Sequence, residues 1–318
     1  MRKQGGIQNG SLMIAAPDEW SAGVLDLDAY LKRIGYSGPV VPSEATLAGL
    51  YRAHLAAIRF ENLDVFLRGS VDVSLEAIQD KVVYRGRGGY CYEQAQLFGA
   101  VLERLGFEVE RLLARVGPDG GAARPRTHMT LRVRADGGVW LADPGFGSSP
   151  PAPLFLPHPP PLPHPPPLRR YRSGGPQETD GWIYEVVPDS EHGEAVWKLR
   201  EHQAGQWVTL HRWTDAVVQP VDVVLSNHYT STHPDSWFTW QPVIVKRTPD
   251  AIISLLGRTY TVTKAGYAKT RATLPDREFA EKLTGEFALS LTPDEVAAAV
   301  AAPTGHDKQP AVGVAPGT

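Results

Sequence analysis

The stretch HMTLRVRADGGVWLADPGFG, residues 128–147, is where the sequence changes from helical to strand-like periodicity. Apolar and polar residues alternate on both sides of ADGG (135–138), and an Asp-Gly pair between such segments is a strong signal for a hairpin turn. The stretch therefore predicts two antiparallel strands, roughly 128–135 and 139–143, joined by a tight turn.

The geometry of this hairpin predicts which side chains meet. A two-residue turn at Asp136 and Gly137 pairs residues whose numbers sum to 273, so Asp143 faces Thr130, on the same face as His128. Cβ atoms on such a diagonal are about 7–8 Å apart or less, within side-chain reach. A four-residue loop keeps this parity, whereas a three-residue loop breaks it. A carboxylate beside an imidazole fixes its tautomer and stabilises the imidazolium, so we expect Asp143 to orient His128 as a base.

A candidate nucleophile lies upstream, in YRGRGGYCYEQAQLF (84–98). Cys91 is the only cysteine among 318 residues, and it stands where a glycine-containing loop becomes a helical pattern. The N-terminus of a helix favours a thiolate, and its free N–H groups can also stabilise an oxyanion. Gly88 and Gly89 allow a tight turn and leave space beside the sulfur. Together with His128 and Asp143, Cys91 would form a nucleophile, base and orienting acid. The alternative is a small buried hydrophobic residue with no catalytic role.

The other nine histidines are weaker candidates for the base. His54 falls in a predicted helix, and the rest lie in the proline-rich segment, the tail, or ordinary strand and loop contexts: His158, His164, His192, His202, His211, His228, His233 and His306. Only His128 shares a predicted hairpin with a suitably placed carboxylate.

Working outward from the hairpin, apolar residues at helical spacing predict an N-terminal bundle, and alternating patterns then predict an all-β region and a mixed α/β region. We divide the chain into a loose leader (1–23), a helical bundle with the cysteine (24–107), a β-barrel-like unit with His128 and Asp143 (108–213), an α/β lid (214–302) and a disordered tail (303–318). The segment 150–168 is rich in proline, which cannot join a sheet, so we predict an inserted surface loop. A docking site for a proline-recognising partner is the alternative for that loop.

Composition excludes several classes of function. The formal net charge of −3 gives no electrostatic footprint for nucleic acid. One cysteine excludes an intrachain disulfide and a multi-cysteine metal site, which fits a reducing compartment. No stretch approaches the roughly 20 apolar residues of a membrane-spanning helix. We therefore expect a cytoplasmic protein with no metal, no membrane partner and no nucleic-acid partner.

Six segments in order resemble the arylamine N-acetyltransferases: FENLDVFL (60–67), RGGYCYEQ (87–94), THMTLRV (127–133), WLADPGFG (140–147), SNHYTSTHPDSWF (226–238) and YTVTKAG (260–266). The resemblance covers roughly residues 24–290. It implies an α+β fold with a helical bundle, a β-barrel-like middle and a C-terminal α/β lid, around a Cys-His-Asp core like that of cysteine proteases.

The resemblance also implies a chemistry. Cys91, paired with His128, would take the acetyl group of acetyl-coenzyme A and pass it to an arylamine, hydrazine or arylhydroxylamine, with acetyl-coenzyme A as co-substrate and no permanently bound cofactor. Matching positions near coenzyme A or the acceptor are Thr127, Gly145, Phe146 and Phe238. Glu61 and Arg87 resemble a buried ion pair that supports the cysteine loop.

The chain departs from the family at Ala95, where the family often has asparagine, at Pro144, where it often has a small aliphatic residue, and in the proline-rich insertion. These departures concern the acceptor more than the chemistry. Three alternatives remain open: an amide synthase that forms a macrolactam from a polyketide chain on an acyl carrier protein, a cysteine hydrolase or transglutaminase-like enzyme, and a non-catalytic binding module.

Overall fold

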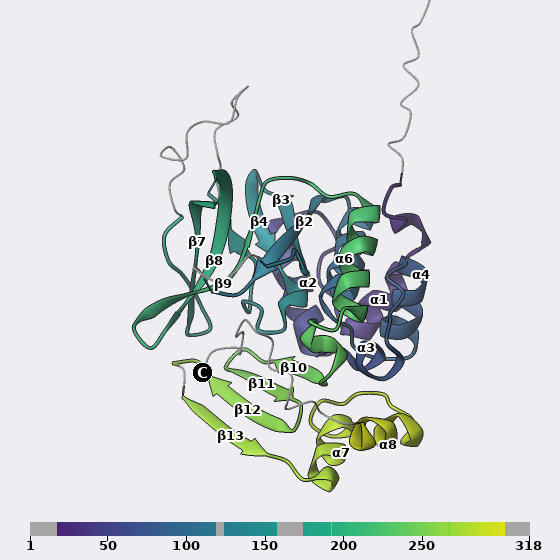
Figure 1. Cartoon of the computed structure of the whole chain (residues 1–318). Coiled ribbons are helices and arrows are strands. Elements are labelled where there is room, and N and C mark those ends of the chain that lie inside the picture. Colours follow the sequence, from purple (N-terminus) through teal and green to yellow (C-terminus); the bar gives the residue numbers. More distant parts are fainter. Residues whose placement is uncertain (1–17, 119–123, 158–173, 192, 267, 303–318) are drawn as a thin grey trace, which may run out of the picture.

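The computed structural model describes residues 18–118, 124–157 and 174–302, apart from 192 and 267. The leader before residue 18, most of the proline-rich segment and the tail after residue 302 lie outside the described residues. Three groups of elements follow one another along the chain: helices, a large sheet, and a second sheet with helices (Figure 1).

The first group is helical and surrounds one central helix. It consists of η1 (Ala22–Val24), α1 (Leu27–Ile34), α2 (Glu44–Ala57), α3 (Leu63–Arg68), α4 (Leu75–Ile78), the π-helical turn η2 (Gln79–Tyr84) and α5 (Cys91–Arg104). Every residue from Cys91 to Leu102 is buried, so α5 is packed on all sides rather than along one stripe. Ser43 is the N-cap of α2, because its side chain accepts from the amide of Thr46.

The second group forms an eight-stranded antiparallel sheet. Its spatial order is β5 (Leu154–Phe155), β4 (Gly138–Ala142), β3 (His128–Ala135), β2 (Glu108–Val116), β9 (Gln206–Trp213), β8 (Glu194–Gln203), β7 (Trp182–Glu191) and β6 (Gln177–Thr179). The predicted hairpin register is confirmed, because Leu131 pairs with Ala142 and Ala135 with Gly138. Asp136 and Gly137 both have positive φ, as a two-residue hairpin turn of this kind requires.

A side chain joins the two edges of this sheet. Gln177 of β6 accepts from the amide of Phe155 at 2.7 Å and donates to its carbonyl at 2.9 Å, so its amide group substitutes for a neighbouring strand. The sheet is thereby nearly closed into a barrel. The chain between the two edge strands starts and ends at neighbouring points, since a Cβ at Gly174 would lie 3.6 Å from the ring of Pro157.

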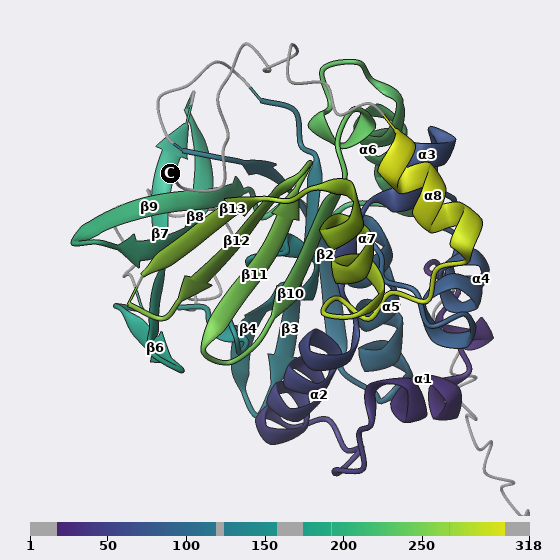
Figure 2. The same cartoon turned by 90° about the horizontal axis from the view of Figure 1, so that it is seen from below.

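The third group lies below the others in Figure 1, and Figure 2 shows its strands crossing in front of the large sheet. It follows α6 (Pro220–Thr232) and η5 (Trp237–Thr239), and contains β10 (Val243–Arg247), β11 (Ala251–Leu256), β12 (Thr259–Lys264), β13 (Lys269–Thr273), α7 (Asp276–Thr284) and α8 (Pro293–Ala301). The short strand β1 (Phe60–Glu61) pairs with β10 and forms a bridge to Gly89. This strand links the loop before Cys91 to the C-terminal sheet.

The largest buried apolar cluster extends from the helices to the inner face of the hairpin strands. It includes Phe98 and Leu102 of α5 together with Met129 and Leu131 of β3. Burial of this shared core fixes α5 against β3, and it therefore sets the position of the cysteine relative to the histidine. Among the described residues no helix is both long and apolar enough to cross a membrane.

Candidate active site

Cys91 is the first residue of α5 and is 3% exposed. Its thiol points to the carbonyl of Thr127, with Sγ and the oxygen 3.7 Å apart. Burial raises the pKa of the Cys91 thiol well above its usual value, while hydrogen bonds from the amides of Met129 and Tyr92 act in the opposite direction. A buried thiol of this kind needs a nearby base to become a nucleophile.

Buried charges brace the loop and first turn that carry Cys91. Glu93 accepts from the amide of Tyr90 at 3.0 Å and pairs with Lys81 at 2.8 Å. Lys81 also contacts Asp64 at 2.8 Å. The predicted partners Arg87 and Glu61 lie 2.8 Å apart, with side chains only 3% and 0% exposed.

The ion pairs continue to the C-terminal helix. Arg87 also contacts Glu295 of α8 at 3.3 Å, and Arg68 of α3 binds the same carboxylate at 2.9 Å. Glu295 in turn accepts from the amide of Thr292 at the start of α8. The cysteine loop is thus connected to α8, the last helix of the described residues, through the Glu295 side chain.

His128 and Asp143 meet across the hairpin. His128 Nε2 lies 2.8 Å from Oδ2 and 3.0 Å from Oδ1 of Asp143, and both side chains are almost completely buried. Because His128 Nε2 contacts Asp143, Nδ1 is the ring nitrogen that remains available to a reacting group. The adjoining residue Thr127 is the one that contacts the sulfur of Cys91, so the three predicted residues gather at one place.

The Asp143 carboxylate is a buried anion. Burial on its own would raise the pKa of Asp143, but the charge and hydrogen bonds of His128 and then of His211 hold it well below its usual range. Asp143 therefore remains ionised at every pH at which the protein would work. A buried carboxylate of this kind requires partners, because an unpaired charge in the protein interior is very costly.

His211 lies in β9, a strand context as the sequence analysis expected, but its side chain reaches the carboxylate of Asp143, which the sequence analysis did not predict. It is completely buried, and its Nε2 lies 2.9 Å from the same Oδ2 that His128 contacts. The N–H is not aimed along this contact, and neither ring nitrogen makes a well-directed hydrogen bond within the described residues. The only available signal was the alternation of QWVTLHRW, which puts His211 on the same face as Trp213 without showing what that face covers.

His128, Asp143 and His211 each offer a ligand atom within 4.8 Å of the others. Tetrahedral zinc at about 2.0–2.1 Å from each ligand would keep two ligand atoms roughly 3.3 Å apart. The nitrogen–oxygen distances of 2.8 and 2.9 Å are shorter than this and belong to direct contacts. The arrangement is therefore that of an acid–base group in direct contact, in which His128 is hydrogen-bonded to Asp143.

The remaining predicted positions surround this group. The ring of Phe146 packs edge-on against His128, with centroids 5.1 Å apart. Gly145 lies against the backbone of Cys91. Phe238 of η5 packs against Phe60 and Tyr90 rather than against His128, with ring centroids 6.0 and 5.9 Å apart.

The two point departures have clear positions. Ala95 is fully buried one turn into α5, within the main core. Pro144 opens the 3₁₀ turn η3 (Pro144–Phe146), where a proline is favoured because no intrahelical N–H is lost. The proline-rich segment is described only up to residue 157, so its predicted character lies outside the described residues beyond that point.

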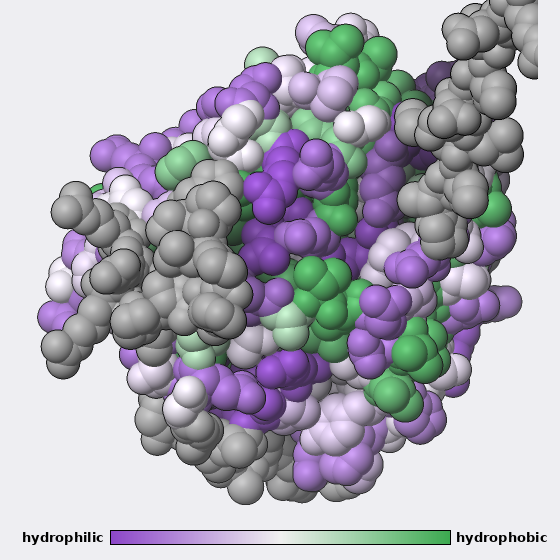
Figure 3. Space-filling view, turned by 90° about the horizontal axis from the view of Figure 1, so that it is seen from above, coloured by the Kyte–Doolittle hydropathy of each residue, from purple (hydrophilic) through white to green (hydrophobic). Residues whose placement is uncertain are grey.

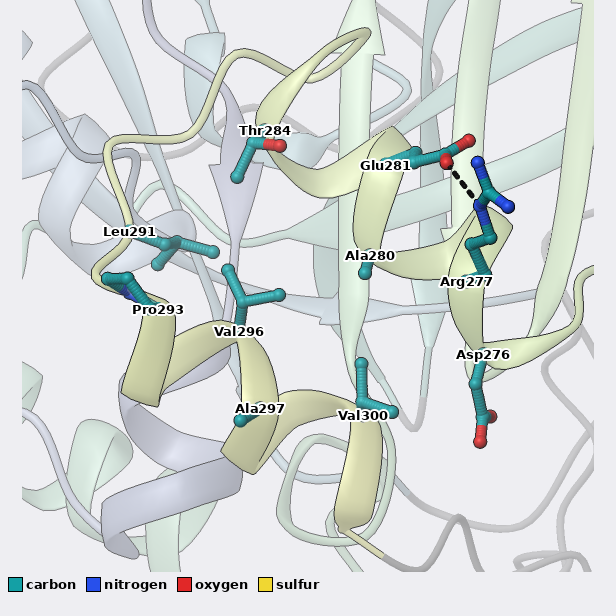
Figure 4. A pocket seen from close by; sticks show the side chains of 10 residues that line it. All are labelled: Asp276, Arg277, Ala280, Glu281, Thr284, Leu291, Pro293, Val296, Ala297 and Val300. Atoms are coloured by element: carbon teal, nitrogen blue, oxygen red, sulfur yellow. Dashed lines mark hydrogen bonds and ion pairs between the residues drawn. The ribbon is translucent and has the colours of Figure 1, made fainter.

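A pocket also lies between α7 and α8, with Leu291, Val296 and Val300 pointing between the two helices (Figure 4). None of its lining residues belongs to the group around Cys91.

Seen from above, the molecule has hydrophobic side chains gathered near the middle of one face among hydrophilic ones (Figure 3). Exposed apolar side chains occur on α6, at Val221, Val224 and Leu225.

A cysteine beside a histidine that contacts a carboxylate is an arrangement that can carry an acyl group on the thiol. A family model described as N-acetyltransferase matches residues 44–296. The arylamine N-acetyltransferase of Mycolicibacterium smegmatis is 36% identical over 249 residues, which is 76% of this chain and 84% of that protein.

Solved structures agree with the sequence comparison. The arylamine N-acetyltransferase of Mycobacterium abscessus superposes with a TM-score of 0.81 and 29% identity, covering 90% of this chain and 98% of the other. The Mycobacterium marinum arylamine N-acetyltransferase in complex with CoA gives a TM-score of 0.75 and 32% identity, covering 86% and 98%. This chain belongs to the arylamine N-acetyltransferase family.

Proposed function

We propose that the protein transfers an acetyl group from acetyl-coenzyme A, through acetyl-Cys91, to the nitrogen of an arylamine, hydrazine or arylhydroxylamine. The observation that carries the proposal is the buried contact between His128 Nε2 and Asp143, at 2.8 Å, beside the Thr127 carbonyl that the Cys91 thiol contacts. Family membership supports the acetyl donor and the amine acceptor, and one relative was solved in complex with CoA.

In the first half-reaction the Cys91 proton passes to His128, and Sγ attacks the thioester carbon. The carbon–sulfur bond to coenzyme A breaks, and the leaving thiolate takes the proton from His128. Asp143 keeps the imidazole in the tautomer that can accept at Nδ1, and it stabilises the imidazolium that forms. The amides of Tyr92 and Met129, which hydrogen-bond the sulfur, stabilise the thiolate.

In the second half-reaction the acceptor nitrogen attacks the acetyl carbon of acetyl-Cys91. His128 takes the proton from that nitrogen and returns it to Sγ as the thioester bond breaks. The product is an N-acetylated amine or hydrazine, and the enzyme recovers its thiol. This order of events gives ping-pong kinetics.

The test is mass spectrometry of the full chain, both intact and after proteolytic digestion, following incubation with acetyl-coenzyme A alone. We expect the mass of one acetyl group on the peptide that contains Cys91, its loss on addition of an arylamine, and no such addition in Cys91→Ala. If acetyl-coenzyme A leaves the folded enzyme unmodified while a carrier-bound acyl thioester modifies Cys91, the donor in this proposal is wrong. Rapid acetate release without an acceptor would instead indicate a hydrolase.

A further inference from the structure

We propose that His211 is a positioning residue for the acyl transfer, one that keeps the Asp143 carboxylate ionised and directed at His128. The inference rests on the proposed roles of Cys91, His128 and Asp143. It gives a function to a completely buried histidine whose ring nitrogens make no well-directed hydrogen bond within the described residues. Such a group is costly to bury unless it serves another group nearby.

The sheet builds this contact from two strands that flank a third. His128 pairs with Ala114 of β2, and His211 pairs with Val116 of the same strand from the other side. Ala114, which is fully buried, also pairs with Trp213. Ala114 therefore lies on the face shared by both histidines, and its small side chain leaves room for the two imidazoles. Their ring centroids are 5.0 Å apart.

The imidazole rings of His128 and His211 both contact the Asp143 carboxylate. His128 Nε2 lies within hydrogen-bond distance of both oxygens of Asp143, and His211 Nε2 lies 2.9 Å from Oδ2. The ring of His211 is also held between Phe146 and Trp213, with centroid distances of 5.0 and 5.3 Å. These aromatic neighbours restrict its movement, so the N–H dipole stays beside the carboxylate.

The charge state of His211 suits this role. Burial, assisted by the like charge of His128, lowers the pKa of His211, although Asp143 opposes the shift. A neutral imidazole places its polar Nε2 2.9 Å from the anion without adding a positive charge. A charged His211 would compete for Asp143 and repel the imidazolium of His128 that forms when Cys91 loses its proton.

The titratable groups acting on this cluster come from four elements: Tyr51 of α2, Cys91 of α5, His128 of β3 and His211 of β9, with Arg247 of β10 acting on Tyr51. Burial raises the pKa of Tyr51 well above its usual value, so the phenol stays neutral. Removing His211 therefore leaves His128 as the one imidazole that supports the anion. A hydrogen-bond donor near a carboxylate favours its charged form, so the loss should make Asp143 easier to protonate and Cys91 harder to deprotonate.

The experiment measures the rate of Cys91 alkylation by iodoacetamide against pH in the full chain. Cys91 is the only cysteine in the sequence, so the label reports one thiol. We expect His211→Phe to move the midpoint of reactivity to higher pH by about one unit or more, which is roughly tenfold slower alkylation below the midpoint. His211→Gln keeps an N–H donor and should restore most of the wild-type profile.

The matched control is His202→Phe on the adjacent strand, where the ring packs against Trp207 away from Asp143. It should leave the profile unchanged. His211→Leu, a second variant without a donor, replaces His211→Phe if the latter does not fold, as judged by circular dichroism.

A double-mutant comparison tests whether His211 acts through Asp143. In an Asp143→Asn background, His211→Phe should cause no further shift of the midpoint. An unchanged or downward-shifted midpoint in His211→Phe, or an equal shift in the Asp143→Asn background, would overturn the inference. Alkylation needs no acetyl donor, so this result is independent of whether acetyl-coenzyme A modifies the enzyme.

Discussion

Gly145 lies so close to Cys91 that a Cβ at position 145 would be 2.8 Å from the Cys91 carbonyl oxygen and 3.0 Å from its Cα. Both neighbours are backbone atoms at the start of a buried helix, so they cannot move aside as a flexible side chain would. The 3₁₀ turn after Asp143 and the first turn of α5 are therefore packed backbone to backbone. This close approach holds the acid and the nucleophile at a fixed separation.

Gly145→Ala should consequently separate Cys91 from His128. We expect the rate of Cys91 acetylation to fall by at least tenfold, because small displacements of reacting groups are costly in rate. Gly174→Ala is the matched control, since its nearest neighbour would be 3.6 Å away and its φ is not positive. Unchanged acetylation in Gly145→Ala would mean that this contact does not set the geometry of the site.

Asp143→Asn tests the orienting role of the carboxylate. The variant keeps the shape of the side chain but removes the charge that faces His128 Nε2. We expect the second-order rate of Cys91 acetylation to fall by about 10³–10⁴-fold, as the loss of tautomer control in such triads implies. Stopped-flow measurement of coenzyme A release checks this. A loss of less than about tenfold would show that His128 functions without the acid.

The buried ion pair between Arg87 and Glu61 should matter for stability. Removing one partner leaves an uncompensated charge, so Arg87→Met should lower the free energy of unfolding by about 3–5 kcal/mol. The double variant Arg87→Met with Glu61→Met should recover part of this loss. Urea unfolding measures both.

The exposed pair of Arg52 and Asp180 provides the comparison, with side chains 49% and 30% exposed. Arg52→Met should cost less than about 1 kcal/mol, because water screens such pairs. If both arginine variants lose the same small amount, the buried pair does not brace the cysteine loop.

His54 should make the protein sensitive to mild acid. Burial lowers the pKa of His54 from 6.5 to about 4, and its ring nitrogens contact the Tyr30 hydroxyl at 2.8 Å and Gln94 at 3.2 Å. The unfolded chain therefore binds a proton that the folded chain does not, and stability falls as the pH decreases from about 6.5 to about 4. The full difference is about 3 kcal/mol.

His54→Gln should remove this part of the pH dependence. The measurement is the free energy of urea unfolding at several pH values for both proteins. We expect the difference in the free energy of unfolding between the wild type and His54→Gln to change by about 3 kcal/mol between pH 6.5 and pH 4. A constant difference would show that His54 does not titrate on unfolding.

The hairpin could be predicted from the sequence because every determinant is local. The turn type follows from Asp136 and Gly137, and the turn fixes the pairing that brings Asp143 to the side of His128. The start of α5 was equally readable, from two glycines followed by a helical pattern. These two local features place the predicted acid beside the base and the cysteine at a helix start, while the core shared by α5 and β3 brings the nucleophile to them.

His211 could not be found in the same way. Its strand pairs with β2, which lies some 90 residues earlier in the chain, and no turn residue specifies that pairing. The π-helical turn Gln79–Tyr84, which directly follows α4, was also not predicted, since apolar spacing in this region indicates only a helical bundle. In both cases packing against distant elements decides the outcome.

The amide of Gln177 bound to Phe155, with Gly174 beside Pro157, has a consequence for how this protein can change over time. The Gln177 side chain nearly closes the large sheet into a barrel. The chain leaves this barrel at Pro157 and returns to it at Gly174, beside Pro157. The geometry of the barrel therefore does not fix the number of residues between Pro157 and Gly174. A gene could gain or lose sequence here, and an engineer could attach a reporter here, without altering the spacing of Cys91, His128 and Asp143.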